Sequence, residues 1–141
     1  GCQLATAGTL ESNMNIRDAS ERCGLPSKTL RYYETIGLVV PSRSENGYRD
    51  YCDDDVAQLN FVRRARDLGF SIDDCRSLLA LWADTSRASA DVRAIASRHL
   101  VAVEEKLAEL GAMQRTLSAL VSACHGNQSS ECPILRDLSN G

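Results

Sequence analysis

The feature that most constrains the fold is a stretch of 33 residues, 91–123, that contains no proline and a single glycine. It predicts one helix about 50 Å long, because an α-helix rises about 1.5 Å per residue. A heptad pattern follows this helix, and most of its a and d positions are aliphatic. These positions are Leu100, Val103, Leu107, Leu110, Gln114, Leu117, Val121 and Cys124. So long a helix cannot bury its apolar seam inside a small domain, so we expect it to pair with a second copy in a homodimer. The alternative is packing along its own N-terminal domain.

The N-terminal half predicts a helix-turn-helix followed by a hairpin. One helix starts near Ile16 and ends at Gly24, and a second covers residues 28–35, with Pro26 or Ser27 at its start. Because proline has no side-chain cap, we expect Ser27 to supply one. The apolar run 38–40, a turn at Asn46-Gly47 and the run 48–51 predict the two strands of a wing.

Two further helices are expected between the hairpin and the long helix. Three aspartates, 53–55, favour the start of a helix that runs to Gly69, and Ser71 with Asp74 resembles a capping box that starts another through Trp82. The predicted fold is therefore mainly α. It comprises an N-terminal extension (1–13, non-native or disordered), a winged helix-turn-helix (14–83), a dimerisation coiled-coil helix with its lead-in (84–123), and a loop with a short terminal helix (124–141).

The net charge of −3 and the pI of about 5.4 argue against a nucleic-acid partner, because nucleic-acid-binding domains often have a pI above about 9. The charge is unevenly distributed, however. Residues 14–66 hold nine Lys/Arg against eight Asp/Glu, a balance of +1, whereas residues 67–141 hold seven against ten, a balance of −3. The cations of the first segment gather on the second helix, on the wing and at the end of the next helix, where they can contact phosphates.

Of the six cysteines, Cys2, Cys23, Cys52 and Cys75 stand among ordinary helix-like residues, where burial or neutrality is expected. Cys124 and Cys132 lie eight residues apart in a short polar stretch and can face each other across one loop. A disulfide framework is not expected, because the sequence has no export signal. It also has no stretch apolar enough for a membrane span. For Cys124 and Cys132, a disulfide, a redox switch and an iron–sulfur centre remain alternatives to a metal site.

The motifs of the N-terminal half strongly resemble the DNA-binding domain of MerR-family transcription regulators. They are the run Ser27-Lys28-Thr29-Leu30-Arg31-Tyr32-Tyr33-Glu34, the pair Gly37-Leu38, the run Arg43-Ser44-Glu45-Asn46-Gly47-Tyr48-Arg49, and residues 61–71. The likeness covers nearly all of residues 14–138. It implies a homodimer that binds an inverted repeat in a promoter whose −35 to −10 spacer is too long, and that bends and untwists this DNA for RNA polymerase when an effector binds. We expect the following residues to contact double-stranded promoter DNA: Ser27, Lys28, Arg31, Tyr33, Arg43, Tyr48 and Arg49.

The C-terminal loop resembles that of the copper-efflux regulators within this family. The residues that carry this likeness are Ala123-Cys124-His125-Gly126 and Cys132-Pro133-Ile134-Leu135. Soft thiolates select Cu(I), so Cys124 and Cys132 are the expected metal ligands, with Ag(I) or Au(I) as related effectors. The divalent-metal branches add a cysteine at the position of Ser89, which makes Ser89 the expected metal-selectivity position. His125 is expected to face solvent.

The sequence thus predicts a Cu(I)-responsive transcription activator of copper efflux and detoxification genes in a bacterial cytoplasm. Two alternatives stay open: a sensor of another metal or of a redox signal with the same fold, and a dimeric metal-buffering protein. An enzyme is not expected, because the chain shows neither a nucleophile–base pair nor a phosphate loop.

Overall fold

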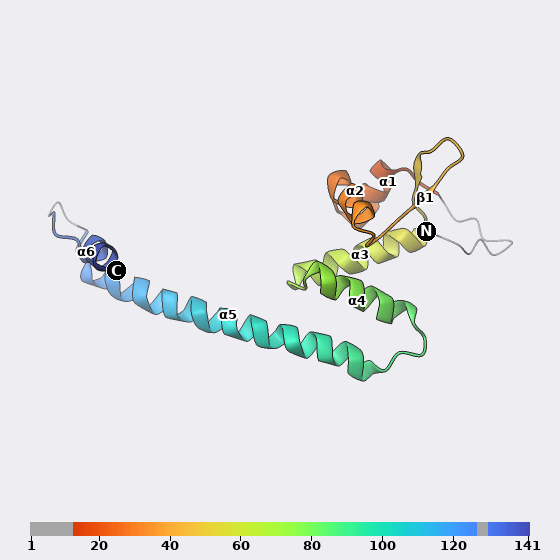
Figure 1. Ribbon diagram of the computed structural model, residues 1–141. Helices are drawn as coiled ribbons and strands as arrows, with labels where there is room; N and C mark the ends of the chain where they lie inside the picture. The colour runs from red at the N-terminus through yellow and green to blue at the C-terminus, as the bar shows by residue number, and fades with distance from the viewer. Residues whose placement is uncertain (1–12, 127–129) are drawn as a thin grey trace. The chain divides into compact units, whose positions relative to one another are not determined.

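The computed structural model describes residues 13–126 and 130–141, and the chain divides after Val92 into two compact units (Figure 1). The first unit contains the N-terminal helices and the hairpin, and the second contains most of the long helix together with the short terminal helix. Helices end at residues 83 and 123, and the domain bounds expected there stay predictions.

Helices α1 (Ile16–Cys23) and α2 (Ser27–Thr35) form the predicted helix-turn-helix. The Asn15 side chain caps α1, and Gly24 ends it in the left-handed region with a φ of 72°. The expectation that Ser27 caps α2 is wrong. Pro26 occupies the cap position, with extended backbone and no side-chain hydrogen bond, and Ser27 is already helical.

The hairpin consists of β1 (Ser42–Arg43) and β2 (Arg49–Asp50), paired antiparallel. Its turn is the predicted one, since Gly47 has a φ of 84° and its N–H donates to the Ser44 carbonyl at 2.9 Å. The first strand, however, lies later than expected. Leu38 and Val39 are buried and donate their N–H groups to the Tyr33 carbonyl, so they extend the end of α2 instead of pairing in a sheet.

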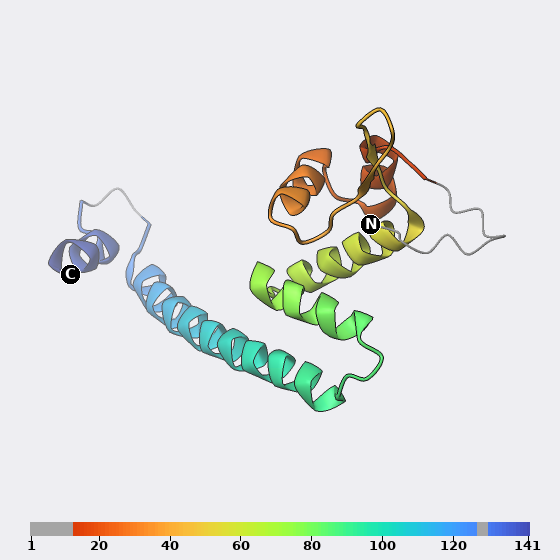
Figure 2. The same cartoon turned by 45° about the vertical axis from the view of Figure 1, so that its right-hand side comes forward.

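Helices α3 (Asp53–Asp67) and α4 (Ile72–Ala83) pack against each other, and α3 also packs on α1 (Figure 2). As predicted, α3 begins with three aspartates and the Ser71 side chain caps α4. A residue just before α1 also pairs with the residue after β2: Met14 and Tyr51 exchange backbone hydrogen bonds of 2.8 Å. No sequence pattern indicates this contact. The resulting core is largely aliphatic: Met14, Ala19, Cys23, Leu30, Tyr33, Leu38, Val39, Tyr51, Val56, Leu59, Val62, Ala65 and Cys75.

The long helix α5 (Ser89–Ala123) has 35 residues and begins two residues earlier than predicted. The short helix α6 (Pro133–Asn140) opens with proline at its first position, as expected. Neither helix has a buried residue within this single chain. Among the described residues, no helix is both long enough and apolar enough to cross a membrane.

Candidate functional site

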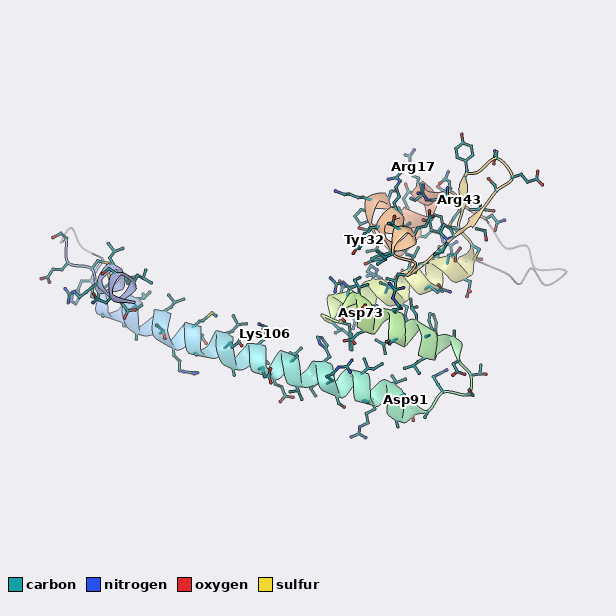
Figure 3. All side chains as sticks on the ribbon, viewed as in Figure 1. Arg17, Tyr32, Arg43, Asp73, Asp91 and Lys106 are labelled. Carbon is teal, nitrogen blue, oxygen red and sulfur yellow. The ribbon has the colours of Figure 1, made fainter. Side chains whose placement is uncertain are left out.

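The side chains of Lys28, Arg31 and Tyr32 on α2 are exposed, and Figure 3 shows Tyr32 on this helix. These residues lie three and four positions apart, which places them on one side of a helix. Tyr33, the expected DNA contact, is instead only 5% exposed and belongs to the core, where burial raises the pKa of its hydroxyl. Tyr32 is 53% exposed. The aromatic ring that α2 offers to a partner is therefore that of Tyr32.

The hairpin contacts α2 through two of the residues expected to contact DNA, Arg43 and Arg49. Tyr48 is 72% exposed near the hairpin turn. Arg43 and Arg49 form ion pairs with Glu34 of α2, whose carboxylate accepts a hydrogen bond from each, at 2.7 Å and 3.0 Å. Both arginines thus hold the hairpin to the helix through at least one of their nitrogens.

The C-terminal end of α2 is held by Arg76, a contact that no sequence motif indicates. Arg76 on α4 donates to the carbonyls of Ile36 at 2.9 Å and Gly37 at 3.2 Å. A cation at this end also interacts favourably with the helix dipole. About forty residues separate the partners in sequence, so no local pattern could have revealed the contact.

The three arginines near the end of α3 differ in their surroundings. Arg63 lies beside the tight turn at Gly24, where an added Cβ would stand 3.7 Å from the Arg63 Cδ. Arg66 donates to the Phe70 carbonyl at 2.7 Å. Arg64 is exposed. Arg66 therefore makes a local structural contact in addition to adding positive charge.

Cys124 and Cys132 are brought together, as the sequence predicts. Cys124 directly follows α5, Cys132 directly precedes α6, and both are half-buried free thiols. The pKa of Cys132 lies below its ordinary value, because the backbone N–H groups of Leu135 and Ile134 and the thiol of Cys124 donate hydrogen bonds to its sulfur. A thiolate at the start of a helix is favoured in this way by the unpaired N–H groups there.

The remaining candidate ligands lie elsewhere or face solvent. Cys23 and Cys75 are free and buried as expected, and burial raises the pKa of Cys75. Cys52 is also buried, but it is disulfide-bonded rather than free. The expectation for Cys2 falls outside the described residues. Over residues 13–126 and 130–141, no cluster of three or more His, Cys, Asp or Glu side chains is arranged to hold a metal.

A pair of adjacent thiols suits a soft ion that accepts two ligands. Cu(I) is such an ion, whereas structural Zn(II) sites are almost always four-coordinate. His125 is exposed, as expected, and Ser89, the first residue of α5, is exposed as well. Two soft thiols are therefore the candidate metal donors in the described part of the chain.

Comparison with known proteins identifies the family. Residues 14–81 match the family model of MerR HTH family regulatory proteins, and residues 56–120 match the MerR DNA-binding model. The transcriptional regulator HmrR of Rhizobium leguminosarum bv. viciae is 59% identical over 128 residues, which cover 91% of this chain and 99% of HmrR. The regulator CueR of Yersinia pestis is 40% identical over 127 residues, which cover 89% of this chain and 91% of CueR.

A solved structure agrees with these relatives. The transcription regulator PbrR691 from Ralstonia metallidurans CH34, in complex with lead(II), superimposes with a TM-score of 0.77 at 33% identity and covers 89% of this chain and 98% of its own. The relatives are transcription regulators, which confirms the expectation of a regulator rather than an enzyme. The chain belongs to the MerR family of helix-turn-helix, DNA-binding transcription regulators.

Proposed function

We propose that this regulator is a Cu(I)-responsive transcription activator, and that it acts as a homodimer on a promoter of copper efflux genes. The observation that carries the proposal is the contact between the Cys124 and Cys132 thiols at the junction of α5 and α6. Two soft donors with no third ligand clustered beside them in the described residues favour a two-coordinate soft ion. The family membership and the similarity to HmrR and CueR support a metal-responsive regulator, and we place it in a bacterial cytoplasm.

On the DNA side, α2 is the recognition helix of the proposal. Lys28, Arg31 and Tyr32 form its exposed face, and Ser27 lies in its first turn, where backbone N–H groups can meet a phosphate. The hairpin is the wing of the proposal, and its residues Arg43, Tyr48 and Arg49 would contact the phosphate backbone of the DNA beside the recognition helix. Two such units in a symmetric dimer would read the two halves of an inverted repeat.

On the metal side, the pKa of the Cys132 thiol lies below its ordinary value, because its sulfur accepts backbone hydrogen bonds. A thiolate is the form that binds metals. Ser89 supplies a hydroxyl where the resemblance places a cysteine in divalent-metal sensors. Ag(I) and Au(I) share the softness of Cu(I) and are expected to bind at the same pair.

In the proposed response, Cys124 and Cys132 would hold the metal between them, which would fix the two ends of the 124–132 segment. Fixing these ends would set the start of α6, whose apolar side chains would then dock on the body of the dimer. These side chains are Ile134, Leu135 and Leu138, and the two leucines are exposed within the single chain. The docking of α6 would change how the paired α5 helices lie against each other, and this movement would reach the two DNA-binding units. The dimer would bend and untwist the promoter so that RNA polymerase can use both elements.

Anaerobic titration of the purified protein against competing chelators tests the metal assignment. We expect one equivalent of Cu(I) per protomer, bound more tightly than Zn(II) by several orders of magnitude, because two thiolates leave a four-coordinate ion underligated. The matched control carries both Cys124→Ser and Cys132→Ser and should lose the Cu(I) site. Zn(II) binding at least as tight as Cu(I) binding would replace the proposal with a divalent-metal sensor.

Gel shifts on the same protein separate the regulator from a metal-buffering protein. We expect the dimer to select one inverted repeat from a random duplex library, with and without Cu(I). A protein that binds Cu(I) but selects no sequence would be a metal buffer, and the proposal would fall.

A further inference from the structure

Glu34 lies where α2 meets the hairpin, and its carboxylate binds both strands. One oxygen, Oε1, accepts from Nη2 of Arg43 at 2.7 Å, and the other, Oε2, accepts from Nε of Arg49 at 3.0 Å. Arg43 uses its second terminal nitrogen, Nη1, to donate to the Gly47 carbonyl in the hairpin turn at 3.1 Å. One acidic side chain on the recognition helix therefore connects to β1, to β2 and, through Arg43, to the turn.

The strand register shows why this carboxylate matters. Arg43 and Arg49 are direct partners across the two strands. Two like charges in such a position repel each other and destabilise a hairpin. Each strand has only two residues, so the backbone hydrogen bonds alone give the hairpin little stability. Glu34 offsets the repulsion by placing one negative charge between the two cations.

The burial of Glu34 strengthens the contact. Its side chain is only 16% exposed, and Arg49 is also largely covered. Solvent screens such a pair less than it screens an exposed surface ion pair. Nearby, Tyr51 is fully buried and its pKa is raised to about 12, first by burial and then by the negative charge of Glu34. The carboxylate thus sits at the edge of the core.

We propose that Glu34 is a positioning residue for DNA recognition, which sets the hairpin at a fixed angle to α2 by holding Arg43 and Arg49 together. The inference rests on the proposed DNA-facing side of α2 and the hairpin. The inference gives Arg43 and Arg49 a role besides DNA contact, because both are already bound to Glu34 when the protein meets DNA. The two arginines then contribute mainly by fixing the position of the hairpin relative to α2. They contribute less as unrestrained side chains that contact phosphates.

Glu34→Gln tests the inference, because glutamine keeps the shape of the side chain and removes its charge. The matched control is Glu45→Gln, which removes the same charge from the exposed hairpin turn. Affinity would be measured for the duplex that the wild type selects from a random library and for a scrambled duplex of equal length. We expect Glu34→Gln to lower the ratio of these affinities by about tenfold, since the hairpin loses its register.

Salt dependence provides the readout that a general loss of stability would not produce. Freeing two arginines from Glu34 should steepen the plot of log affinity against log salt by up to about two units on the scrambled duplex, because each added phosphate contact contributes about 0.9. Glu45→Gln should raise both affinities together and leave their ratio and the slope unchanged.

Glu34→Asp keeps the test decisive if Glu34→Gln does not fold. Aspartate retains the charge but is one methylene too short to reach both arginines, so we expect a smaller loss of the affinity ratio in a stably folded protein. Equal ratios for wild type, Glu34→Asp and Glu34→Gln would overturn the inference. Absence of any sequence preference in the wild type would instead overturn the proposed DNA-facing surface on which the inference rests.

Discussion

Leu110→Asp is expected to convert the dimer to monomers and to weaken operator binding by more than 100-fold. Leu110 is 59% exposed in the single chain and lies on the apolar seam of α5, together with Leu107, Leu117 and their heptad neighbours. Burying one leucine contributes about 1.5–3 kcal/mol, and a symmetric interface buries two copies. The introduced carboxylate adds a desolvation penalty on each side of the interface.

The effect on DNA follows from the two-fold arrangement. A monomer presents one recognition helix and loses the second half-site, so much of its sequence-specific affinity disappears. The control is Ala108→Asp, which adds the same charge to an exposed position of the same helix away from the seam. Sedimentation equilibrium and gel shifts would measure both variants. A wild-type protein that is monomeric at micromolar concentration, or a Leu110→Asp variant that behaves like Ala108→Asp, would contradict the proposed dimer.

Cys132→Ser is expected to abolish the Cu(I)-induced part of transcription while leaving operator binding intact. Serine keeps the size of the side chain but replaces a soft thiolate with a hydroxyl that stays protonated, so the site retains one soft ligand. Loss of a residue that only hydrogen-bonds to a metal ligand lowers metal affinity by up to roughly 100-fold. Loss of a ligand itself should therefore lower Cu(I) affinity by more than this. Cys124→Ser should have the same effect, since the two sulfurs lie in hydrogen-bond contact.

His125→Ala is the matched control for the cysteine variants. His125 is adjacent to Cys124 and exposed, so its loss should leave Cu(I) affinity and induction unchanged. Competition with a Cu(I) chelator and transcription measured at saturating Cu(I) would give the two quantities. Full induction in both serine variants would exclude the cysteine pair as the sensor, and a loss of induction in His125→Ala would add a third ligand.

The elements that the sequence predicted well are those with strong local signals. Gly24 and Gly47 have the positive φ that their turns require, Ser71 caps α4, and the proline-free stretch is one helix. The Cys124–Cys132 contact was also predictable, because a short loop cannot take its two ends far apart. These features depend on neighbouring residues, so a pattern in the sequence is enough to identify them.

The features that the sequence did not predict depend on contacts between distant segments. Val39 and Tyr33 carry residue types that suit a strand and a DNA contact, but both are drawn into the core by packing. Arg76 reaches across about forty residues to the end of α2, and Glu34 joins both strands of the hairpin. Residue type alone could not distinguish an arginine that contacts DNA from one that holds the fold in place.

Transcription in a purified system would measure whether Cu(I) activates this regulator directly. The template would carry the selected operator in a promoter whose spacer is too long, with a second template of optimal spacer as the reference. We expect Cu(I) to raise transcription from the long-spacer template by about tenfold or more, which corresponds to a shift of at least about 1.4 kcal/mol between the two states of the complex. On the optimal-spacer template Cu(I) should give no increase. Equal transcription with and without Cu(I) on the long-spacer template, in the presence of bound dimer, would exclude Cu(I) as the activating signal.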